Sequence, residues 1–469
     1  MREPNAHELL FLPLGGSGEI GMNLNLYGHD GRWLMVDCGI GFSQEQGVTE
    51  VIMADPRFIE GRRERLEGIV VTHAHEDHLG AIPHLWSRLR CPVYATPFAA
   101  AVLRRKLAEA ELLDQVPLIV VDRSAPLELG PFSLSFLDVT HSTVESQAVL
   151  ITTPVGTVLH TGDFKLDARP IVGPTTDLAA IRAAGERGIL AAISDSTNAT
   201  KTTASRSEGE LSEQLSTRLS ELGPRRIAVA SFSSNIARIK TLIDIAARLD
   251  RHPVFVGRSL QRMVSAAREC DYLEPAQTEV TPRDFGFLPP SKTLLICTGT
   301  QGEPGSATER ISRDDHRDIH LDPGDIVLFS AKIIPGNEAA LERLHAKLRT
   351  KGCQVISELE EFVHVSGHPG QPELRAVYEL ARPQIVVPVH GEARHMAAHA
   401  ELARDMGIAS VVPSNGTVVR LAPGPPEITE RVENGRLVLK QKRRPARPPR
   451  KAGPGGSRGS KAPRGSKGP

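Results

Sequence analysis

The stretch Thr72-His73-Ala74-His75-Glu76-Asp77-His78 places three imidazoles and two carboxylates directly behind the apolar residues 68–71. Neutral imidazole and carboxylate are the side chains that bind borderline and hard divalent metals. The order His-x-His-x-Asp-His offers one pair of ligands at alternate positions and a second pair side by side. We therefore predict that this stretch serves two metal ions, because a solvated charged turn seldom carries three histidines.

The spacing of these histidines differs from that of the zincins. In the motif H-E-x-x-H, two histidines at positions i and i+4 share one face of a helix. His75 and His78 are only three positions apart, and Glu76 directly follows His75. We therefore expect the ligands to lie on a loop between a strand and a helix.

Composition indicates a globular protein with more than one domain. The chain has 469 residues, 40% of them hydrophobic, which suffices for two or three cores of roughly 150 residues each. Its five cysteines show no C-x-x-C spacing, which argues against a disulfide framework or a thiolate zinc site and favours a cytoplasmic location. We expect neither secretion nor a membrane span, because the sequence contains no signal peptide pattern and no apolar run of about eighteen residues.

Charge is distributed unevenly along the chain. Residues 441–469 contain ten Lys and Arg and no acid, so that residues 1–440 carry 46 basic against 56 acidic residues, a net charge of −10. A basic segment rich in Pro, Gly and Ser is typical of a disordered tail. Such a tail either attracts polyanions such as nucleic acid or only improves solubility.

Two patterns of secondary structure divide the chain. Up to about residue 205, short strands, turns and a few helices indicate an α/β fold with much antiparallel pairing. From 206 to 361, strands recur before glycine- or serine-rich loops and helices, as at 226–230, which is typical of a parallel sheet with helices on its faces. Residues 385–389 then resemble a buried strand of the first core. We therefore predict that the second domain is inserted into the first.

Individual elements of the first domain follow from the same patterns. We predict helices at 97–110 and 178–184, and strands at 9–14, 24–27, 33–37, 69–72, 118–122, 132–138, 148–152 and 157–160. Residues 16–21 match the dinucleotide fingerprint G-x-G-x-x-G, but the fingerprint requires a helix directly afterwards. The alternation of apolar and polar residues at 22–27 predicts a strand there instead, so we expect no dinucleotide site.

Three further polar residues each follow an apolar run. They are His141 after 136–140, Asp163 after 158–162 and His390 after 386–389. A single residue of this kind is more often a cap or a satisfied core group than a ligand. Together with the histidine stretch, however, they supply the ligands that a two-metal site still requires.

Nine stretches match motifs of a known group. They are GGSGEIGMN at 15–23, VDCG at 36–39, THAHEDHLGA at 72–81, THS at 140–142, HTGDFK at 160–165, SDSTN at 194–198, IPGNE at 334–338, HVSGH at 364–368 and PVHGE at 388–392. On these motifs the chain resembles the metallo-β-lactamase-fold hydrolases of the β-CASP group, and most closely the ribonuclease J family. The histidine stretch is specific for the fold superfamily, and HVSGH followed by PVHGE narrows the resemblance to the RNA-processing branch.

The resemblance implies an α/β fold with a particular domain order. A metallo-β-lactamase αββα sandwich would comprise residues 1–205 and 362–424, with a β-CASP α/β domain inserted at 206–361. Residues 425–469 would form a short segment and a disordered basic tail. Because the resemblance ends near residue 424, short of the family's usual C-terminal domain, the oligomeric state stays open, with a homodimer as one option.

The resemblance also implies the metal ligands. His73, His75, His141 and Asp163 would hold one metal, and Asp77, His78, Asp163 and His390 would hold the other, with Asp163 bridging the two. Asp37 resembles a residue that orients ligands from behind, although a turn former ahead of Gly39 fits the sequence equally well. We expect two divalent ions and prefer zinc because nitrogen ligands dominate, with manganese as the alternative.

Further roles follow from the two motifs that distinguish the β-CASP nucleases. Asp195 and His368 would form the catalytic acid-base pair, because an aspartate facing an imidazole keeps it protonated near neutral pH. The loops that would contact substrate phosphate comprise Phe232, Ser233, Ser234, His364, Val365, Ser366, Gly367 and His368. Residues 231–235 could equally be a plain helix N-cap segment.

The implied activity is hydrolysis of RNA phosphodiester bonds. The family pattern indicates a 5′-to-3′ exonuclease on 5′-monophosphorylated single-stranded RNA, with some endonuclease activity, in rRNA processing and mRNA decay. Single-stranded RNA and other RNA-decay proteins are the expected partners. Two alternatives are a hydrolase of a small thioester, lactam or cyclic phosphodiester, which needs neither HVSGH nor the insertion, and a non-catalytic RNA-binding scaffold, which would have lost ligands.

Overall fold

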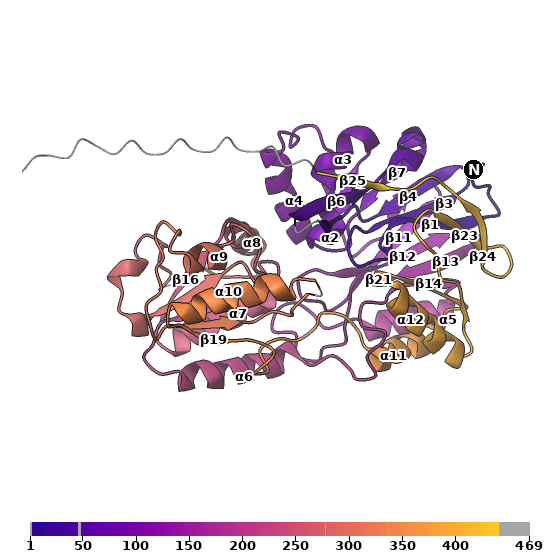
Figure 1. The fold of residues 1–469 in the computed structure, drawn as a ribbon. Coiled ribbons are helices and arrows are strands. Elements are labelled where there is room, and N and C mark those ends of the chain that lie inside the picture. Colours follow the sequence, from indigo (N-terminus) through magenta and orange to yellow (C-terminus); the bar gives the residue numbers. More distant parts are fainter. Residues whose placement is uncertain (1, 46–47, 277, 335, 440–469) are drawn as a thin grey trace, which may run out of the picture. The chain divides into compact units, whose positions relative to one another are not determined.

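Two β-sheets face each other in the first domain of the computed structural model, which describes residues 2–45, 48–276, 278–334 and 336–439 (Figure 1). The eight-stranded sheet has the order β24 (Glu427–Arg431), β23 (Thr417–Ala422), β1 (Leu9–Gly15), β3 (Leu24–His29), β4 (Arg32–Val36), β7 (Leu66–Val70), β8 (Val93–Ala95), β9 (Leu118–Val120). The seven-stranded sheet has the order β10 (Leu127–Leu129), β11 (Phe132–Asp138), β12 (Gln147–Thr153), β13 (Gly156–His160), β14 (Ala191–Asp195), β20 (Ile385–Val389), β22 (Ala409–Ser410).

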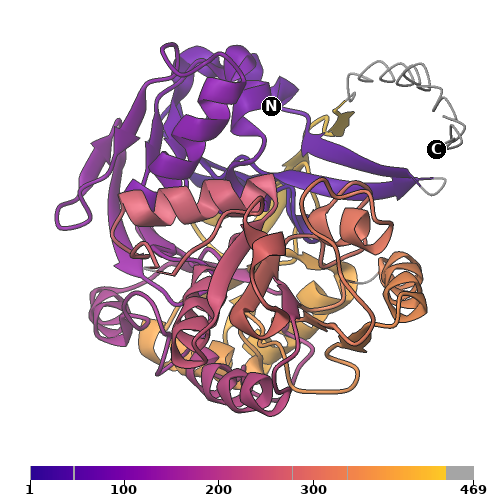
Figure 2. The same cartoon turned by 90° about the vertical axis from the view of Figure 1, so that its left-hand side faces the viewer.

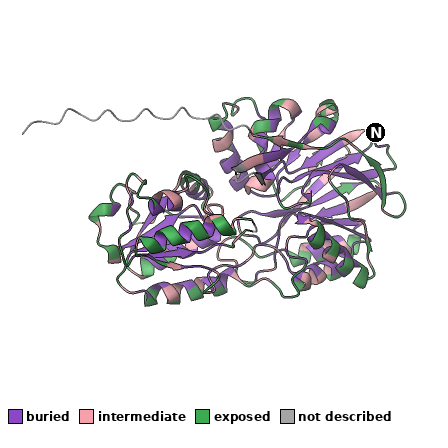
Figure 3. Cartoon of the chain, viewed as in Figure 1, coloured by how far each residue is buried: buried purple, intermediate pink, exposed green. Residues whose placement is uncertain are grey.

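The apolar faces of these two sheets form one continuous core. Phe11 and Leu34 from the first sheet cluster with Phe136, Ile193 and Val387 from the second, and all five are buried. Figure 3 shows the strands of both sheets mostly as buried. Burial of this shared apolar area is the main contribution to the stability of such a sandwich.

Helices cover the outer faces of the sandwich. The helices α5 (Leu178–Arg187), α11 (Gln371–Ala381) and α12 (Ala393–Asp405) contribute to a second apolar cluster on the seven-stranded sheet. The helix α4 (Pro97–Glu109) packs against β8 and β9 of the other sheet, next to α3 (Ile82–Leu89) in the chain. The predicted αββα sandwich is therefore confirmed.

The second domain is inserted between β14 and β20. These two strands pair in parallel, with Asp195 opposite Val389, so that the chain leaves the sheet at one strand and returns at its neighbour. The insertion contains an all-parallel sheet of β16 (His252–Val256), β17 (Thr293–Cys297), β15 (Ile227–Ala230), β18 (Ile326–Phe329), β19 (Gln354–Ile356). The predicted insertion and parallel sheet are both confirmed, whereas the exact domain boundaries stay predictions.

Helices surround the sheet of the inserted domain (Figure 2). They are α6 (Glu208–Glu221), α7 (Ile236–Arg248), α8 (Arg258–Glu269), α9 (Ala307–Ser312) and α10 (Glu338–Thr350). Arg238 on α7 is fully buried and its guanidinium donates to both carboxylate oxygens of Glu208, at 3.1 Å each. This buried ion pair fixes the entry into the inserted domain, because Glu208 is the first residue of α6.

The short segment predicted after residue 424 forms two strands. β24 pairs with β23, and β25 (Arg436–Val438) pairs antiparallel with β6 (Val48–Ala54). The edge strands β23 and β6 offer unpaired backbone groups, and this segment satisfies them. The rest of the predicted tail, residues 440–469, lies outside the described residues.

Further predictions can be compared with the structure. Residues Ser17–Gly18 form the short strand β2, and β3 follows, so the strand predicted at 22–27 in place of a helix is confirmed. All five cysteines are free thiols. Among the described residues, no helix combines the length and the apolarity that a membrane crossing requires.

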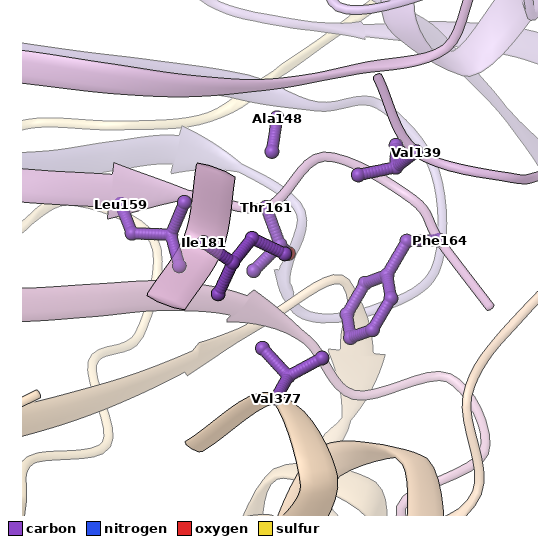
Figure 4. A pocket seen from close by; sticks show the side chains of 7 residues that line it. All are labelled: Val139, Ala148, Leu159, Thr161, Phe164, Ile181 and Val377. Carbon is purple, nitrogen blue, oxygen red and sulfur yellow. The ribbon is translucent and has the colours of Figure 1, made fainter. Parts of the chain in front are cut away.

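A small cavity of about 10 Å³ lies in the apolar cluster behind the seven-stranded sheet (Figure 4). Its lining residues are Val139, Ala148, Leu159, Thr161, Phe164, Ile181 and Val377. Thr161 is the only polar residue among them, and its hydroxyl already donates to the carbonyl oxygen of Gly162 at 2.7 Å. A void of this size without further polar partners is a packing defect and not a ligand site.

Truncation of Phe164 should enlarge this cavity. Phe164 is 1% exposed and packs against the void, so Phe164→Ala should lower the free energy of unfolding by about 3–5 kcal/mol. Urea denaturation measures the loss, and Phe164→Leu, which keeps most of the volume, should lose clearly less. Equal midpoints for wild type and Phe164→Ala would contradict this packing role.

Candidate metal centre and active site

The carboxyl ends of strands from both sheets supply the predicted site residues. The strands β13, β14 and β20 are parallel neighbours, and Asp163, Asp195 and His390 lie at or just beyond their carboxyl ends. The strands β4 and β7 are also parallel neighbours, and they lead into Asp37 and His73. Because carboxyl ends of parallel strands meet at the same edge of a sheet, residues distant in sequence come together here.

The histidine stretch is only partly a loop. His73 and His75 lie between β7 and α2 (Glu76–Leu79), as predicted, but Asp77 and His78 belong to α2 itself. The loop prediction is therefore wrong for these two residues. His75 has extended backbone angles and its carbonyl oxygen accepts the first helical hydrogen bonds, so that the next residues turn into a helix. Two acidic residues in the first turn suit the positive end of this helix.

The first predicted ligand group comes together in the structure. It comprises His73, His75, His141 and Asp163, and their nearest nitrogen and oxygen atoms all lie within 4.8 Å of one another. His75 Nδ1 lies 3.1 Å from His73 Nε2 and 3.1 Å from His141 Nε2. Asp163 Oδ2 is 3.8 Å from His141 Nε2.

The second predicted group shares Asp163 with the first. It comprises Asp77, His78, Asp163 and His390, again within 4.8 Å. Asp163 Oδ2 lies 3.2 Å from His78 Nε2, and Asp163 Oδ1 lies 3.5 Å from His390 Nδ1. Asp77 Oδ2 lies 3.5 Å from His390 Nε2. All seven predicted ligands therefore stand at one place, with Asp163 between the two groups.

These separations suit divalent cations. Ligand atoms bound tetrahedrally at about 2.1 Å lie roughly 3.4 Å apart, which is close to the observed spacing. Burial lowers the pKa of His75 to about 4, and burial lowers the pKa values of His73 and His141 well below their usual range. These three imidazoles are therefore neutral at neutral pH, as metal binding requires. The donor set thus fits divalent metal ions.

The remaining charges of the centre also favour a cation. Burial opposes a charge on His78, but Asp163, Asp37 and Asp77 outweigh it and raise the pKa of His78 well above its usual value. Burial likewise opposes ionisation of Asp163, but His390 and His78 hold the pKa of this carboxyl well below its usual value. The carboxylates that attract a proton here attract a divalent cation for the same reason.

A second layer of hydrogen bonds orients the histidines. His78 Nδ1 donates to Asp37 Oδ2 at 2.7 Å, and His141 Nδ1 donates to the carbonyl oxygen of Gly367 at 2.6 Å. In both rings the other nitrogen, Nε2, therefore faces the centre. Asp37 also accepts from the backbone N–H and the hydroxyl of Thr72, and it has a left-handed φ of 63°. Asp37 is thus both a turn residue and a support for His78, so the two readings of the sequence coexist.

Two glycines allow the backbone to approach the centre closely. A Cβ atom at Gly39 would lie 1.6 Å from the carbonyl oxygen of Asp77, and one at Gly367 would lie 2.8 Å from the ring of His141. Both distances are shorter than van der Waals contact, so larger residues would displace Asp77 or His141. This explains the glycine in each of the motifs VDCG and HVSGH.

Asp195 and His368 form a close pair beside the two groups. His368 Nδ1 lies 2.7 Å from Asp195 Oδ2 and 3.9 Å from Asp163 Oδ2. Burial opposes a charge on His368, but Asp195 outweighs this effect with its charge and hydrogen bond and raises the pKa of His368 to about 9. The imidazole is therefore protonated near neutral pH, which is the state that a proton donor requires.

The predicted phosphate loops lie on both domains. Phe232, Ser233 and Ser234 follow β15 at the carboxyl edge of the inserted sheet and are half-buried. Asn235 caps α7 by accepting from the backbone N–H of Arg238, so the N-cap reading holds for this residue. The second loop runs from His364 to His368, and Ser366 Oγ accepts from Asn198 Nδ2 at 2.7 Å. Val365 in this loop is buried, and its contact with substrate stays a prediction.

Sequence reasoning missed three residues that contact this set. Asn23 Nδ2 lies 3.2 Å from His78 Nε2 and 3.1 Å from His390 Nδ1 and donates to the carbonyl oxygen of Asp77. Thr72 connects Asp37 with His73, and Asn198 connects the SDSTN and HVSGH motifs. All three lie within the motifs quoted above, and this position was the signal in the sequence that could have identified them.

The loop after His141 is tied to the inserted domain. Glu145 accepts from the backbone N–H of Phe98 at 2.7 Å and from the hydroxyl of Tyr272 at 3.0 Å. Glu145 is 7% exposed and has a left-handed φ of 56°. The carboxylate of Glu145 therefore connects its own loop, which carries His141, to the start of α4 and to the segment that follows α8 in the sequence.

Three family descriptions match successive parts of the chain. Residues 22–204 match the metallo-β-lactamase superfamily, residues 224–348 match the ribonuclease J β-CASP domain, and residues 352–413 match a Zn-dependent metallo-hydrolase RNA specificity domain. Ribonuclease J of Sinorhizobium meliloti is 42% identical over 93% of this chain and 80% of its own length. The chain belongs to the ribonuclease J family. Ribonuclease J of Mycolicibacterium smegmatis is 40% identical over 91% of this chain and 77% of that protein.

A solved structure shares the fold of this ribonuclease J family member. A protein of unknown function from Enterococcus faecalis superimposes with a TM-score of 0.62 at 16% identity, over 88% of this chain and all of that chain. At this identity the likeness supports the fold alone.

Removal of the Asp37 carboxylate charge should weaken metal binding. Asp37→Asn keeps the size and the left-handed turn but loses the charge that holds His78, so affinity for divalent metal should fall about 10–100-fold. Metal titration of the purified chain measures the change. Asp122→Asn, an exposed control in the same domain, should bind like wild type, and equal affinity for Asp37→Asn would contradict the orienting role.

Proposed function

We propose that the chain hydrolyses RNA phosphodiester bonds at this centre with two divalent metal ions, zinc in preference to manganese. The observation that carries the proposal is the pair of ligand groups that share Asp163, with the Asp195–His368 pair 3.9 Å away. The imidazole-rich first group favours zinc, and the mixed second group also suits manganese. Two divalent ions, when bound, would supply activation of the attacking water and charge neutralisation at the scissile phosphate.

Side chains of the protein would bind the ions and transfer the proton. The residues that would hold the ions are His73, His75, Asp77, His78, His141, Asp163 and His390. Asp195 orients His368 and keeps it protonated, so that His368 donates a proton to the leaving oxygen as the phosphodiester bond breaks. Most of these side chains are buried, whereas His75, Asp77 and His368 are partly exposed. Burial strengthens the charge interactions at the reacting phosphate.

Single-stranded RNA is the substrate that best fits the two phosphate loops. Residues 232–234 and 364–368 offer hydroxyls and backbone N–H groups from both domains, which suit a phosphate backbone. Only 4% of the residues are aromatic, so base stacking contributes little and weak sequence preference is expected. We further propose 5′-to-3′ exonuclease action on 5′-monophosphorylated ends with some endonuclease activity, as in RNA processing and decay.

A cleavage assay tests this proposal. The purified chain should shorten a 5′-monophosphorylated RNA from its 5′ end faster than a 5′-triphosphorylated one, and a chelator should abolish the activity. His75→Ala and Asp163→Ala should each remove activity while circular dichroism stays unchanged, and the exposed control His7→Ala should cleave normally. Hydrolysis of a thioester or lactam without any RNA cleavage would favour the alternative small-substrate hydrolase instead.

The acid-base pair makes a separate prediction. Asp195→Ala and His368→Ala should each lower kcat about 10²–10⁴-fold, because each removes a proton donor or its orienting partner. The double variant should be no slower than the slower single variant, because both act through one proton. Bound metal, measured by elemental analysis, should stay at the wild-type level; its loss would instead indicate that the pair belongs to the metal shell.

A further inference from the structure

The carboxylate of Glu373 accepts four hydrogen bonds inside the metallo-β-lactamase domain. Glu373 is the third residue of α11 and is 3% exposed. Its Oε1 accepts from the backbone N–H of Leu166 at 2.9 Å and from the hydroxyl of Ser205 at 2.6 Å. Its Oε2 accepts from the backbone N–H groups of Ser205 and Gly370, at 2.8 Å each. All four donors are neutral groups, and together they satisfy both carboxylate oxygens.

Helix capping explains only one of these four hydrogen bonds. Gly370 is the N-cap residue of α11, and a glutamate at the third helical position commonly accepts from the backbone N–H of the N-cap. The other three donors belong to Leu166 and Ser205, which lie 207 and 168 residues away from Glu373 in the sequence. A residue that only capped α11 would not need them, so Glu373 has a second role.

Two of the segments that Glu373 binds carry residues of the candidate active site. Leu166 lies three residues after Asp163, the carboxylate shared by the two metal-ligand groups. Gly370 lies two residues after His368, the candidate proton donor, whose Nδ1 is 3.9 Å from Asp163 Oδ2. The carboxylate of Glu373 therefore fixes the separation between the backbone segments that carry Asp163 and His368.

The linker that leads into the inserted domain is bound to the segment after Asp163 at further points. Lys165 Nζ donates to the carbonyl oxygen of Arg206 at 3.1 Å. The carboxylate of the buried Asp167 accepts from the hydroxyl of Ser207 at 2.7 Å and from the backbone N–H at position 208 at 2.8 Å. These hydrogen bonds hold the linker directly before α6, so that the inserted domain starts from a fixed position.

The linker that leads out of the inserted domain is held as well. Arg218 of α6 donates to both carboxylate oxygens of Glu361, at 2.7 Å each. A Cβ atom at Gly370 would lie 2.1 Å from the carbonyl oxygen of Thr203, so the two linkers approach each other more closely than a larger residue would permit. Glu373 therefore binds the two linkers where they pack against each other.

We propose that Glu373 is a positioning residue for the hydrolysis. By binding both segments, it keeps His368 at the distance from Asp163 that proton transfer to the leaving oxygen requires. The inference rests on the proposed function and extends it, because Glu373 lies outside the motifs that carry the family resemblance. Glu373 acts through other residues, since its carboxylate is buried and both of its oxygens already have donors.

Only a carboxylate accepts all four hydrogen bonds. In Glu373→Gln one oxygen becomes an NH₂ group, which donates and does not accept. If this group replaces Oε1, the backbone N–H of Leu166 loses its acceptor. If it replaces Oε2, the backbone N–H groups of Ser205 and Gly370 lose theirs. Either orientation leaves a buried N–H unpaired, so the segments must move apart to reach other acceptors.

The kinetics of Glu373→Gln test the proposal in the full-length, metal-loaded protein. The kcat for RNA cleavage should fall about 10²-fold, because a shift of about 1 Å at the reacting groups suffices for such a loss. KM for RNA and the amount of bound metal should stay at the wild-type level. Glu373→Asp, which keeps both acceptor oxygens on a shorter side chain, should lose less. Asp177→Ala, which removes the acceptor that caps α5 in the same domain, is the matched control and should cleave like wild type.

Two further measurements separate positioning from a general structural role. In the His368→Ala background, Glu373→Gln should lower kcat little further, because both changes act on the same proton transfer. Hydrogen–deuterium exchange of the backbone should be faster in Glu373→Gln than in wild type at residues 163–168 and 366–372. This second readout requires no RNA cleavage.

A wild-type kcat in folded Glu373→Gln would overturn the proposal, whether or not exchange becomes faster. An undiminished loss in the His368→Ala background would also overturn it, because Glu373 would then act independently of His368. If Glu373→Gln does not fold, Glu373→Asp decides by the same two comparisons. Failure of the proposed function is a separate result, which would appear as wild-type protein that cleaves no RNA.

Discussion

The centre depends on the contacts that the carboxylate of Asp163 makes. This carboxylate belongs to both metal-ligand groups, which no other predicted ligand does, and it also lies 3.9 Å from His368 Nδ1. Its position follows from β13, whose carboxyl end is held between β12 and β14 in the seven-stranded sheet. The register of β13 within its sheet therefore decides where the two metal-ligand groups meet.

The centre is costly for folding, and the sheets offset that cost. Buried imidazoles close together and buried carboxylates each lose hydration, and without a cation they are only partly compensated. The apolar core between the two sheets, with residues such as Phe11 and Phe136, supplies the stability that tolerates this cluster. Glycines at 39 and 367 then give the polar groups the close approach that larger residues would prevent.

Sequence reasoning succeeded where the signal is local. The histidine stretch, the apolar runs that end at Asp163 and His390, and the strand-loop-helix rhythm of the insertion all depend on neighbouring residues, and the structure contains them. It failed where distant partners decide. The pairing of β25 with β6 depends on a strand that lies far away in the sequence. The helix α2 was missed for a different reason, because four residues are too few to show a helical period.

The insertion between β14 and β20 has a consequence for biosynthesis. His390 follows β20, so on the proposed ligand set the second metal group stays incomplete until the entire inserted domain has been translated. Pairing between such distant strands is also slow to form, because a long loop must close first. On that ligand set, a growing polypeptide on the ribosome would hold only the first metal group, and hydrolysis would have to wait for the arrival of β20 and His390.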